Sequence, residues 1–447
     1  MCSKMEKIEP RILSGFVNFL PREQQAFNNL VTKVRETYET YGFLPLDTPI
    51  VDLAEILLAK AGGETEKQIY QMKKGDTNLA LRFDLTVPLA KYVAKNYYQL
   101  KFPYRAYQIG RVYRGERAQR GRFREFYQAD ADIIGDNELN IINDAEIIVL
   151  IYHVFKAINI NRFLIKINNR KIYSGLLTVL GLSDKSTDIL RTIDKASKIG
   201  IEGVKKEFYK LNLLDADINL LVELITLEGD FDQIIKKLQT INNNQNDIFT
   251  EGIVELKELT QYLKAFNVDK NNYQIDLSIT RGLDYYTGTV FETVLKGRED
   301  MGSICGGGRY DNLVSNYSNK KLPGVGMAIG LNRLFYVLNE VNLLDNTKIP
   351  SLDILVAPLT NDLSYSIQVA NELRDSGIKT QIYFDKKSLR SQINYANQLE
   401  IPYIIFIGED EEKTKTVALK ELKTENQVNV SLEEAIKKIK DNNKVEQ

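Results

Sequence analysis

Two stretches of alternating residues, 104–114 and 123–134, flank a loop at 115–121 and together predict an antiparallel β-hairpin. Successive side chains of a strand point to opposite faces, so the even positions of the second stretch share one face. That face carries a guanidinium, an aromatic ring, an amide and two carboxylates, from Arg124, Phe126, Gln128, Asp130 and Asp132. Solvent exposure would explain the polar groups. The ring among them instead favours a site where Phe126 stacks on a ligand.

The same hairpin is rich in arginine. Seven arginines and a single acid, Glu116, lie between residues 105 and 124, although the whole chain has a formal net charge of −1. A run of charge is usually a solvated face, but the guanidinium fork suits phosphates and carboxylates better than lysine does. The local charge therefore indicates an anionic ligand, whereas the net charge gives no indication of nucleic-acid binding.

The residues that most often carry metal or acid–base chemistry are scarce. Cys2 and Cys305 are the only cysteines of the 447 residues, and His153 is the only histidine. Two distant cysteines favour neither a disulfide framework nor a zinc site, and His153 lies in an apolar helical run that is typical of a packing residue. We also find no apolar run that could span a bilayer and no signal-peptide core. We therefore expect a cytoplasmic protein with no membrane association and no protein-held metal.

The pattern along the chain predicts four parts. Residues 1–181 and 269–335 mix strands and helices and form one part. Residues 182–268 are helical in pattern and rich in lysine and asparagine, which indicates an inserted module. Residues 336–350 are a polar connection. Residues 351–447 alternate strands with helices, which predicts a compact α/β domain on a mainly parallel sheet.

A polar and aromatic cluster follows the strand predicted at 273–280. It reads RGLDYYTGTVFE over 281–292, and such a cluster is costly to desolvate without a polar partner. Two glycine-rich segments come next. The first, at 306–308, lacks the GK[ST] of a phosphate-binding loop, and the second, at 324–330, has the wrong spacing for a dinucleotide fingerprint. By themselves these glycines predict only close approach of backbones.

Taken together, these segments resemble class II aminoacyl-tRNA synthetases. The first, second and third signatures of that class resemble FLPLDTPIVD, YRAYQIGRVYRGERAQRGRFREFYQADADIIG and GVGMAIGLNRL. The peptides RGLDYYTGTVFE and CGGGRYDNL are similar to two that are peculiar to histidyl-tRNA synthetases, and ALRFDLTVPLAKYVA fits the same family. The resemblance runs over residues 10–435 and is weakest over 182–268.

The resemblance implies a fold and an activity. The fold is an α+β catalytic domain on a mainly antiparallel sheet, with a helical insertion and a C-terminal α/β anticodon-binding domain. The activity is activation of histidine with ATP and its transfer to the 3′ end of tRNA(His). Mg²⁺ would accompany ATP, no prosthetic group is implied, and the family relation suggests a homodimer. In the C-terminal domain the candidates for tRNA phosphate contacts are Lys386, Lys387, Arg390 and Lys415.

The resemblance also implies two sets of site residues. For ATP, these are Arg114 on the α-phosphate, Glu116 on the adenine edge, Arg122 on the γ-phosphate, and Phe126 and Arg333 on the faces of adenine. For histidine, they are Asp84, Leu85, Thr86, Arg114, Gln128, Asp132, Arg281, Tyr285, Tyr286, Gly306 and Gly307. Arg114 and Arg281 would be catalytic because their cations face the reacting anions. The chain departs from many members in having Asp84 and Asp132 for glutamate, and Asn332 for the glutamate often found before the third-signature arginine.

Two other functions remain open at this point. One is a non-catalytic, histidine-sensing regulatory paralogue of ATP phosphoribosyltransferase, which lacks the C-terminal α/β domain. Residues 351–435 and the retained Arg114, Arg281 and Arg333 favour the ligase over it. The other is a pseudo-synthetase module of a regulator, which predicts fused domains that 447 residues do not accommodate.

Overall fold

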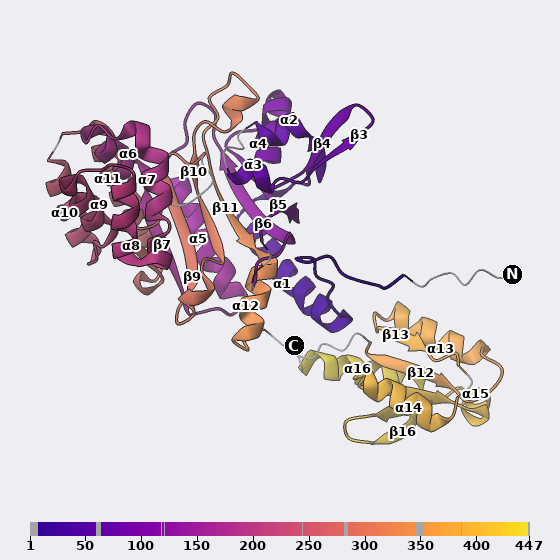
Figure 1. The fold of residues 1–447 in the computed structure, drawn as a ribbon. Coiled ribbons are helices and arrows are strands. Elements are labelled where there is room, and N and C mark those ends of the chain that lie inside the picture. Colours follow the sequence, from indigo (N-terminus) through magenta and orange to yellow (C-terminus); the bar gives the residue numbers. More distant parts are fainter. Residues whose placement is uncertain are drawn as a thin grey trace. The chain divides into compact units, whose positions relative to one another are not determined.

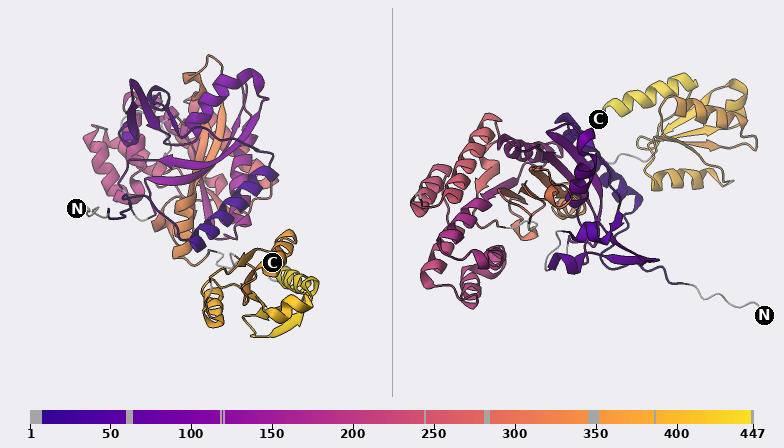
Figure 2. Two further views of the ribbon diagram at one scale, coloured as in Figure 1. Left: turned by 90° about the vertical axis from the view of Figure 1, so that its right-hand side faces the viewer. Right: turned by 90° about the horizontal axis from the view of Figure 1, so that it is seen from above.

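The computed structural model describes residues 8–59, 64–117, 119, 121–243, 245–280, 285–344, 352–385 and 387–445. The chain forms two compact units, Met1–Leu344 and Asp345–Gln447, and each is described by itself. Figures 1 and 2 show the elements of both units.

An eight-stranded sheet is the centre of the first unit. Its order is β1-β5-β6-β11-β10-β9-β7-β8, with the bounds β1 Leu44–Pro45, β5 Tyr104–Tyr113, β6 Glu125–Ile134, β7 Phe163–Asn169, β8 Tyr273–Ile275, β9 Thr289–Leu295, β10 Cys305–Tyr310 and β11 Gly324–Gly330. Only the two outermost pairs, β1 with β5 and β7 with β8, are parallel. The mainly antiparallel sheet and the β5–β6 hairpin are therefore confirmed.

The strand expected at 273–280 is shorter than the alternation predicts. It ends at Ile275 because the carboxylate of Asp276 accepts hydrogen bonds from the backbone N–H and the hydroxyl of Ser278. This local turn competes with the sheet for the backbone. The strand predicted over residues 273–280 is therefore wrong beyond Ile275.

Helices pack on one face of the sheet, and the main hydrophobic core of the unit lies between them and the sheet. They are α1 (Pro21–Thr40), α5 (Ile142–Ala157) and α12 (Leu331–Glu340), and the buried Phe27, Tyr38 and Phe335 lie in this core. His153 is exposed on α5, beside the rings of Tyr41 and Tyr152, so the prediction of a packing residue is wrong. The periodicity places residues on a helix but leaves open which stripe of an almost wholly apolar helix faces solvent.

A second, smaller core joins residues 51–96 to the rest of the unit. Its elements are β2 (Val51–Leu53), α2 (Ala54–Leu58), α3 (Glu64–Gln68), β3 (Gln71–Lys74), β4 (Thr77–Leu81) and α4 (Thr86–Asn96). The strands form a three-stranded sheet of order β2-β4-β3. Ala80, Leu89 and Val93 are buried in this core together with Tyr285 and Tyr310, so it brings α4 to the segment that follows residue 284.

The segment 182–268 is a set of helices, α7 (Ser186–Ile193), α8 (Ala196–Lys210), α9 (Asp215–Ile225), α10 (Phe231–Asn242) and α11 (Asp247–Ala265). In Figure 1 they lie on the side of the sheet where β7 and β9 are labelled, and α11 and α10 contact β7 and β8. The preceding α6 (Arg170–Val179) packs on α11. Phe208 and Leu221 belong to the same buried cluster as the sheet residues, so the helices share the core of the first unit.

The second unit has a five-stranded sheet of order β13-β12-β14-β15-β16. Its elements are β12 Ile354–Pro358, α13 Ser364–Asp375, β13 Thr380–Ile382, α14 Leu389–Gln398, β14 Tyr403–Ile407, α15 Glu409–Thr414, β15 Val417–Glu421, β16 Gln427–Val430 and α16 Leu432–Val445. Two strand pairs are parallel and two are antiparallel, so the expected mainly parallel sheet is mixed. The pattern of residues 351–447 does not indicate the short, half-exposed β16. Among the described residues, no helix is long and apolar enough to cross a membrane.

Candidate active site

A cavity of about 560 Å³ lies over one face of the central sheet, between β6, β10, β11 and α4. This volume is in the range of small-molecule sites. The described candidate residues that line it are Asp84, Thr86, Arg114, Glu116, Arg122, Phe126, Gln128, Asp132, Tyr285, Tyr286, Gly306, Gly307 and Arg333. Leu85 is fully buried and does not line the cavity, and its carbonyl accepts a hydrogen bond from Gln108. Arg281 lies outside the described residues.

Strand β6 supplies the floor in the way its alternation predicts. Phe126, Gln128, Asp130 and Asp132 all line the cavity. Arg124, expected on the same face, does not, since its guanidinium donates to the carbonyls of Glu116 and Ser14 at 3.0 and 3.4 Å. It therefore supports the loop between β5 and β6 rather than the floor.

Arg114 is held at the end of β5 with little freedom. Its Nε donates to the carbonyl of Phe83 at 3.2 Å and its Nη2 to Oε1 of Gln128 at 3.4 Å. The guanidinium carbon lies 4.4 Å from the centre of the Phe83 ring and 5.2 Å from that of Phe126. Burial lowers the pKa of Arg114, and the carboxylates of Asp84 and Glu116 oppose this shift. The cation is thus preorganised toward the cavity.

Asp84 lies two residues before α4, and its carboxylate is held by the first turn of that helix. Its carboxylate accepts a hydrogen bond from the N–H of Val87 at 2.9 Å, the role that aspartate commonly fills at a helix start. Thr86 begins the helix beside it. Burial raises the pKa of the 5 % exposed Asp84, and the hydrogen bond to Val87 and the charge of Arg114 counteract it. A carboxylate and a hydroxyl so placed suit an ammonium group.

The opposite end of the cavity carries further cations. Arg122 and Glu116 form an ion pair at 3.5 Å across the loop between β5 and β6. Arg333, on the first turn of α12, donates to the carbonyl of Met301. The neighbouring Asn332 is buried, and its side-chain oxygen accepts a hydrogen bond from the backbone N–H of Tyr127 at 2.8 Å. The amide of Asn332 therefore ties α12 to β6.

Of the described carboxylates that line the cavity, Asp132 is the most buried one with a hydrogen-bond partner in the structure. The hydroxyl of Tyr310 donates to its Oδ1 at 2.7 Å. Gly326 pairs with Asp132 across β11 and β6, and a Cβ there would overlap the carboxylate. A Cβ on Gly307 would likewise overlap the carbonyl of Gly326. Glycine is thus required at these positions because β6, β11 and β10 approach one another closely, and it leaves room for the buried carboxylate of Asp132.

The electrostatics of Asp132 give a testable pH dependence. Burial, the largest cause, and Asp84 raise its pKa to about 7, while the hydrogen bond from Tyr310 lowers it. The folded protein then binds more protons at this site than the unfolded chain between pH ~4 and ~7, so this group's contribution to stability falls as the pH rises through that window. We expect Asp132→Asn to raise the urea midpoint at pH 8 and to leave it unchanged at pH 4. An equal effect at both pH values would contradict the assignment.

Several residues of the cavity are not indicated by the sequence patterns. Tyr310 belongs to the CGGGRYDNL peptide, and its strand β10 is separated by β11 from the strand of Asp132, so only the register of the sheet brings the two together. Lys195 and Lys198 come from the helical segment 182–268 and also line the cavity. No local pattern relates them to the sheet, because only the packing of the helices brings the turn between α7 and α8 to it.

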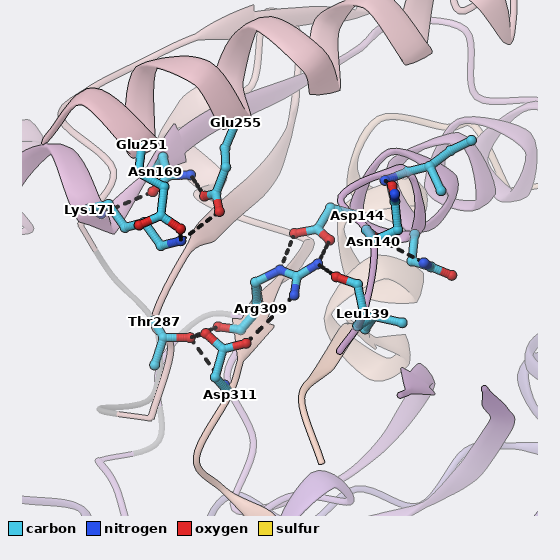
Figure 3. A network of polar contacts seen from close by, with 12 residues as sticks. Leu139, Asn140, Asp144, Asn169, Lys171, Glu251, Glu255, Thr287, Arg309 and Asp311 are labelled. Carbon is cyan, nitrogen blue, oxygen red and sulfur yellow. Dashed lines mark hydrogen bonds and ion pairs between the residues drawn. The ribbon is translucent and has the colours of Figure 1, made fainter. Parts of the chain in front are cut away.

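A network of polar contacts surrounds Arg309, the residue before Tyr310 on β10 (Figure 3). Arg309 of β10 forms a two-pronged ion pair with Asp144 of α5, with Nη2 to Oδ2 at 2.6 Å and Nε to Oδ1 at 3.1 Å. It also donates to the carbonyl of Leu139 at 2.8 Å. Thr287 binds the carboxylate of Asp311, and its backbone N–H donates to the carbonyl of Arg309 at 2.8 Å. These bonds join β10, α5 and the segment after Tyr286.

The Arg309–Asp144 pair is expected to stabilise the fold strongly. The Asp144 side chain is 0 % and that of Arg309 8 % exposed, and loss of one partner leaves a buried charge without its counterion. We expect Asp144→Asn to lower the free energy of unfolding by about 2–3 kcal/mol. Urea unfolding of the free protein measures this. A change below ~0.5 kcal/mol would show that the pair is dispensable.

Comparisons with known proteins agree along the chain. The family model for histidyl-tRNA synthetase matches residues 15–334, and that for an anticodon binding domain matches residues 353–442. A histidine–tRNA ligase of Clostridium tetani is 50% identical over 98% of this chain and 99% of its own length. That of Finegoldia magna is 43% identical over 97% of this chain and 100% of its own length. The crystal structure of histidyl-tRNA synthetase from Nostoc sp. PCC 7120 matches with a TM-score of 0.85 and 35% identity, over 98% of this chain and 100% of that one.

Proposed function

The chain belongs to the histidyl-tRNA synthetase family, and on that premise we propose that its cavity binds histidine and ATP side by side. The activity is ATP-dependent ligation of histidine to tRNA. The observation that carries the site assignment is convergence. Asp84, Arg114 and Asp132 come from three separate elements and line one cavity.

We assign the ATP end to the residues near the β5–β6 loop. Phe126 and Arg333 would enclose adenine, Glu116 would accept from its amino group, and Arg122 would reach the γ-phosphate. A flat base such as adenine stacks favourably between an aromatic ring and a guanidinium group. Mg²⁺ would be held mainly by the phosphates and water, since the described residues contain no cluster of three or more acidic, histidine or cysteine side chains fit for a metal.

We assign the histidine end to the residues around α4 and β6. Asp84, Thr86 and Gln128 would bind the ammonium, and Asp132 with Tyr286 would bind the imidazole nitrogens beside Tyr285. Gly306 and Gly307 would form the floor. An imidazole offers one donor and one acceptor at fixed separation, so an apolar amino acid would leave the buried Asp132 and Tyr286 unpaired.

The chemistry of activation needs no general base. A carboxylate oxygen of histidine attacks the α-phosphorus of ATP, the bond to the β,γ-phosphates breaks, and pyrophosphate leaves with the negative charge. Charge builds on the non-bridging oxygens of the α-phosphorus during this step. Arg114, fixed by Phe83 and Gln128, would stabilise that charge. Arg281 is proposed for the same task and for the substrate carboxylate.

Transfer to tRNA is the second step. We propose tRNA(His) as the acceptor, residues 351–447 as the anticodon-binding domain, 182–268 as an insertion, and 336–350 as the linker, although α12 includes the first part of that linker. Lys387, Arg390 and Lys415 are described on the C-terminal unit, where Lys415 lies 4.4 Å from the centre of the Tyr365 ring. Lys386 lies outside the described residues. A cytoplasmic homodimer is the state we propose for the enzyme.

Histidine-dependent exchange of pyrophosphate into ATP tests the proposal most directly. We expect exchange that requires histidine, and aminoacylation of tRNA(His) by the same preparation. The regulatory paralogue of ATP phosphoribosyltransferase would bind histidine without exchange. Absence of exchange in folded, histidine-binding protein would therefore reject the ligase.

A further inference from the structure

One carboxyl of the cavity has no hydrogen-bond partner in the part of the chain that the structure describes. Asp130 is 1 % exposed and lines the cavity, yet neither of its oxygens hydrogen bonds to any described residue. Burying a carboxyl without a partner is costly. By contrast, the equally buried Asp144 is fully satisfied by Arg309.

The polar neighbours of Asp130 are committed elsewhere. Gln108 is opposite it on β5, but this amide donates to the carbonyl of Leu85 and accepts from Thr48, both at 2.8 Å. Ala328 is opposite it on β11 and has no polar side chain. Arg82 donates from Nε to the carbonyl of Arg111 at 2.8 Å and from Nη1 to the carbonyl of Thr48. Arg114 donates to the carbonyl of Phe83 and to the side chain of Gln128. No described side chain thus bonds to the carboxyl, which is left facing the cavity.

Resting on the proposed function, we propose that Asp130 is a further histidine-binding residue that shares with Asp132 the hydrogen bond from an N–H of the substrate's imidazole ring. The cavity floor places it between Gln128 and Asp132 on one face of β6. One N–H can be shared between two acceptors in a three-centre hydrogen bond, so Tyr286 keeps the second ring nitrogen. Bound histidine would then supply the partner that the described residues lack.

The ring, rather than the ammonium, is favoured by the surroundings of Asp130. Asp130 and Asp132 are alternate residues of β6, in register with Ala328 and Gly326 of β11. Gly326 pairs in turn with Gly308, and a Cβ on Gly308 would lie 3.0 Å from the ring of Tyr286. Asp130 is therefore next to the row of the sheet that holds the two residues assigned to the ring. Asp84 is held by the first turn of α4 at the ammonium end.

The test compares Asp130→Ala with the wild type by calorimetric titration. We expect the Kd for histidine to rise by roughly 10- to 100-fold, because the bound ring loses a hydrogen bond in a buried site. The Kd for ATP should change less than about twofold. Asp130→Asn keeps a donor and an acceptor and should restore part of the affinity. Loss of ATP binding to the same degree would overturn the proposal.

Two further measurements separate this role from a structural one. Asp144→Asn is the matched control, a buried carboxylate with a protein partner, and should lower the melting temperature without raising the Kd for histidine. Asp130→Asn should not lower the melting temperature of the free protein. A melting temperature that falls as in the control, with unchanged histidine affinity, would make Asp130 a structural residue.

A ligand without the ammonium tests the choice of the ring. We expect 3-(imidazol-4-yl)propionate to lose affinity on Asp130→Ala by the same factor as histidine. No loss for this ligand would place the contact at the ammonium and overturn the assignment. The result is independent of the ligase reaction, since wild-type pyrophosphate exchange alone decides the proposed function.

Discussion

Replacement of Arg114 by alanine is expected to lower histidine-dependent pyrophosphate exchange by about a hundredfold or more, the cost of removing one oxyanion donor. The guanidinium is held by the Phe83 carbonyl at 3.2 Å and the Gln128 amide at 3.4 Å. It needs no reorganisation when charge develops on the α-phosphate. Arg114→Lys keeps the charge but loses the fork, and should recover only a small part of the rate.

A matched arginine on the same strand provides the control. Arg111 of β5 is 49% exposed, lies 3.9 Å from Glu125 in an ion pair, and is not among the residues that line the cavity. Arg111→Ala should leave the exchange rate within about twofold. Exchange in Arg114→Ala at the wild-type rate, with folding intact by circular dichroism, would remove Arg114 from the transition state.

The alternation of residues predicted the floor of the site, because a strand leaves only two faces for its side chains. Phe126, Gln128 and Asp132 line the cavity for that reason. Arg124 follows the same alternation, but it precedes Glu125, where β6 begins, and so it is not part of the sheet. Asp84 was predicted from the resemblance to the family and not from the alternation of residues. It is far from β6 in the sequence, so no local pattern indicates that the two lie close together.

Other features depend on contacts that no local pattern contains. The hydrogen bonds from Ser278 to the carboxylate of Asp276 end β8 earlier than predicted, although the residues alternate as in a strand. The unpartnered carboxyl of Asp130 becomes visible only when Gln108 and Ala328 are seen opposite it. Lys195 reaches the cavity from a segment that the sequence marks only as helical. Register and packing decide these cases, and both are properties of the folded chain.

Replacement of Asp132 by alanine is expected to damage histidine use far more than ATP use. The carboxylate is 3 % exposed and accepts from Tyr310 through Oδ1 at 2.7 Å, so its other oxygen remains for the ring of the substrate. Sites built to hydrogen bond a polar group reject ligands that lack it by roughly 10⁴-fold. We expect kcat/KM for histidine to fall by roughly 10²- to 10⁴-fold, with the KM for ATP within about threefold.

The cause of this loss can be separated from a collapse of the cavity. Tyr310→Phe removes the donor to Asp132 but leaves the carboxylate, and should raise the KM for histidine by only about tenfold, the value of one hydrogen bond to a charged group. If Asp132 acts on the ring, the two substitutions together should cost about as much as Asp132→Ala alone, because the hydroxyl acts through the carboxylate. Additive losses would mean that Tyr310 contacts the substrate itself. A KM for ATP that rises before that for histidine would move Asp132 out of the histidine site, since the nucleotide would then be the ligand that depends on the carboxylate.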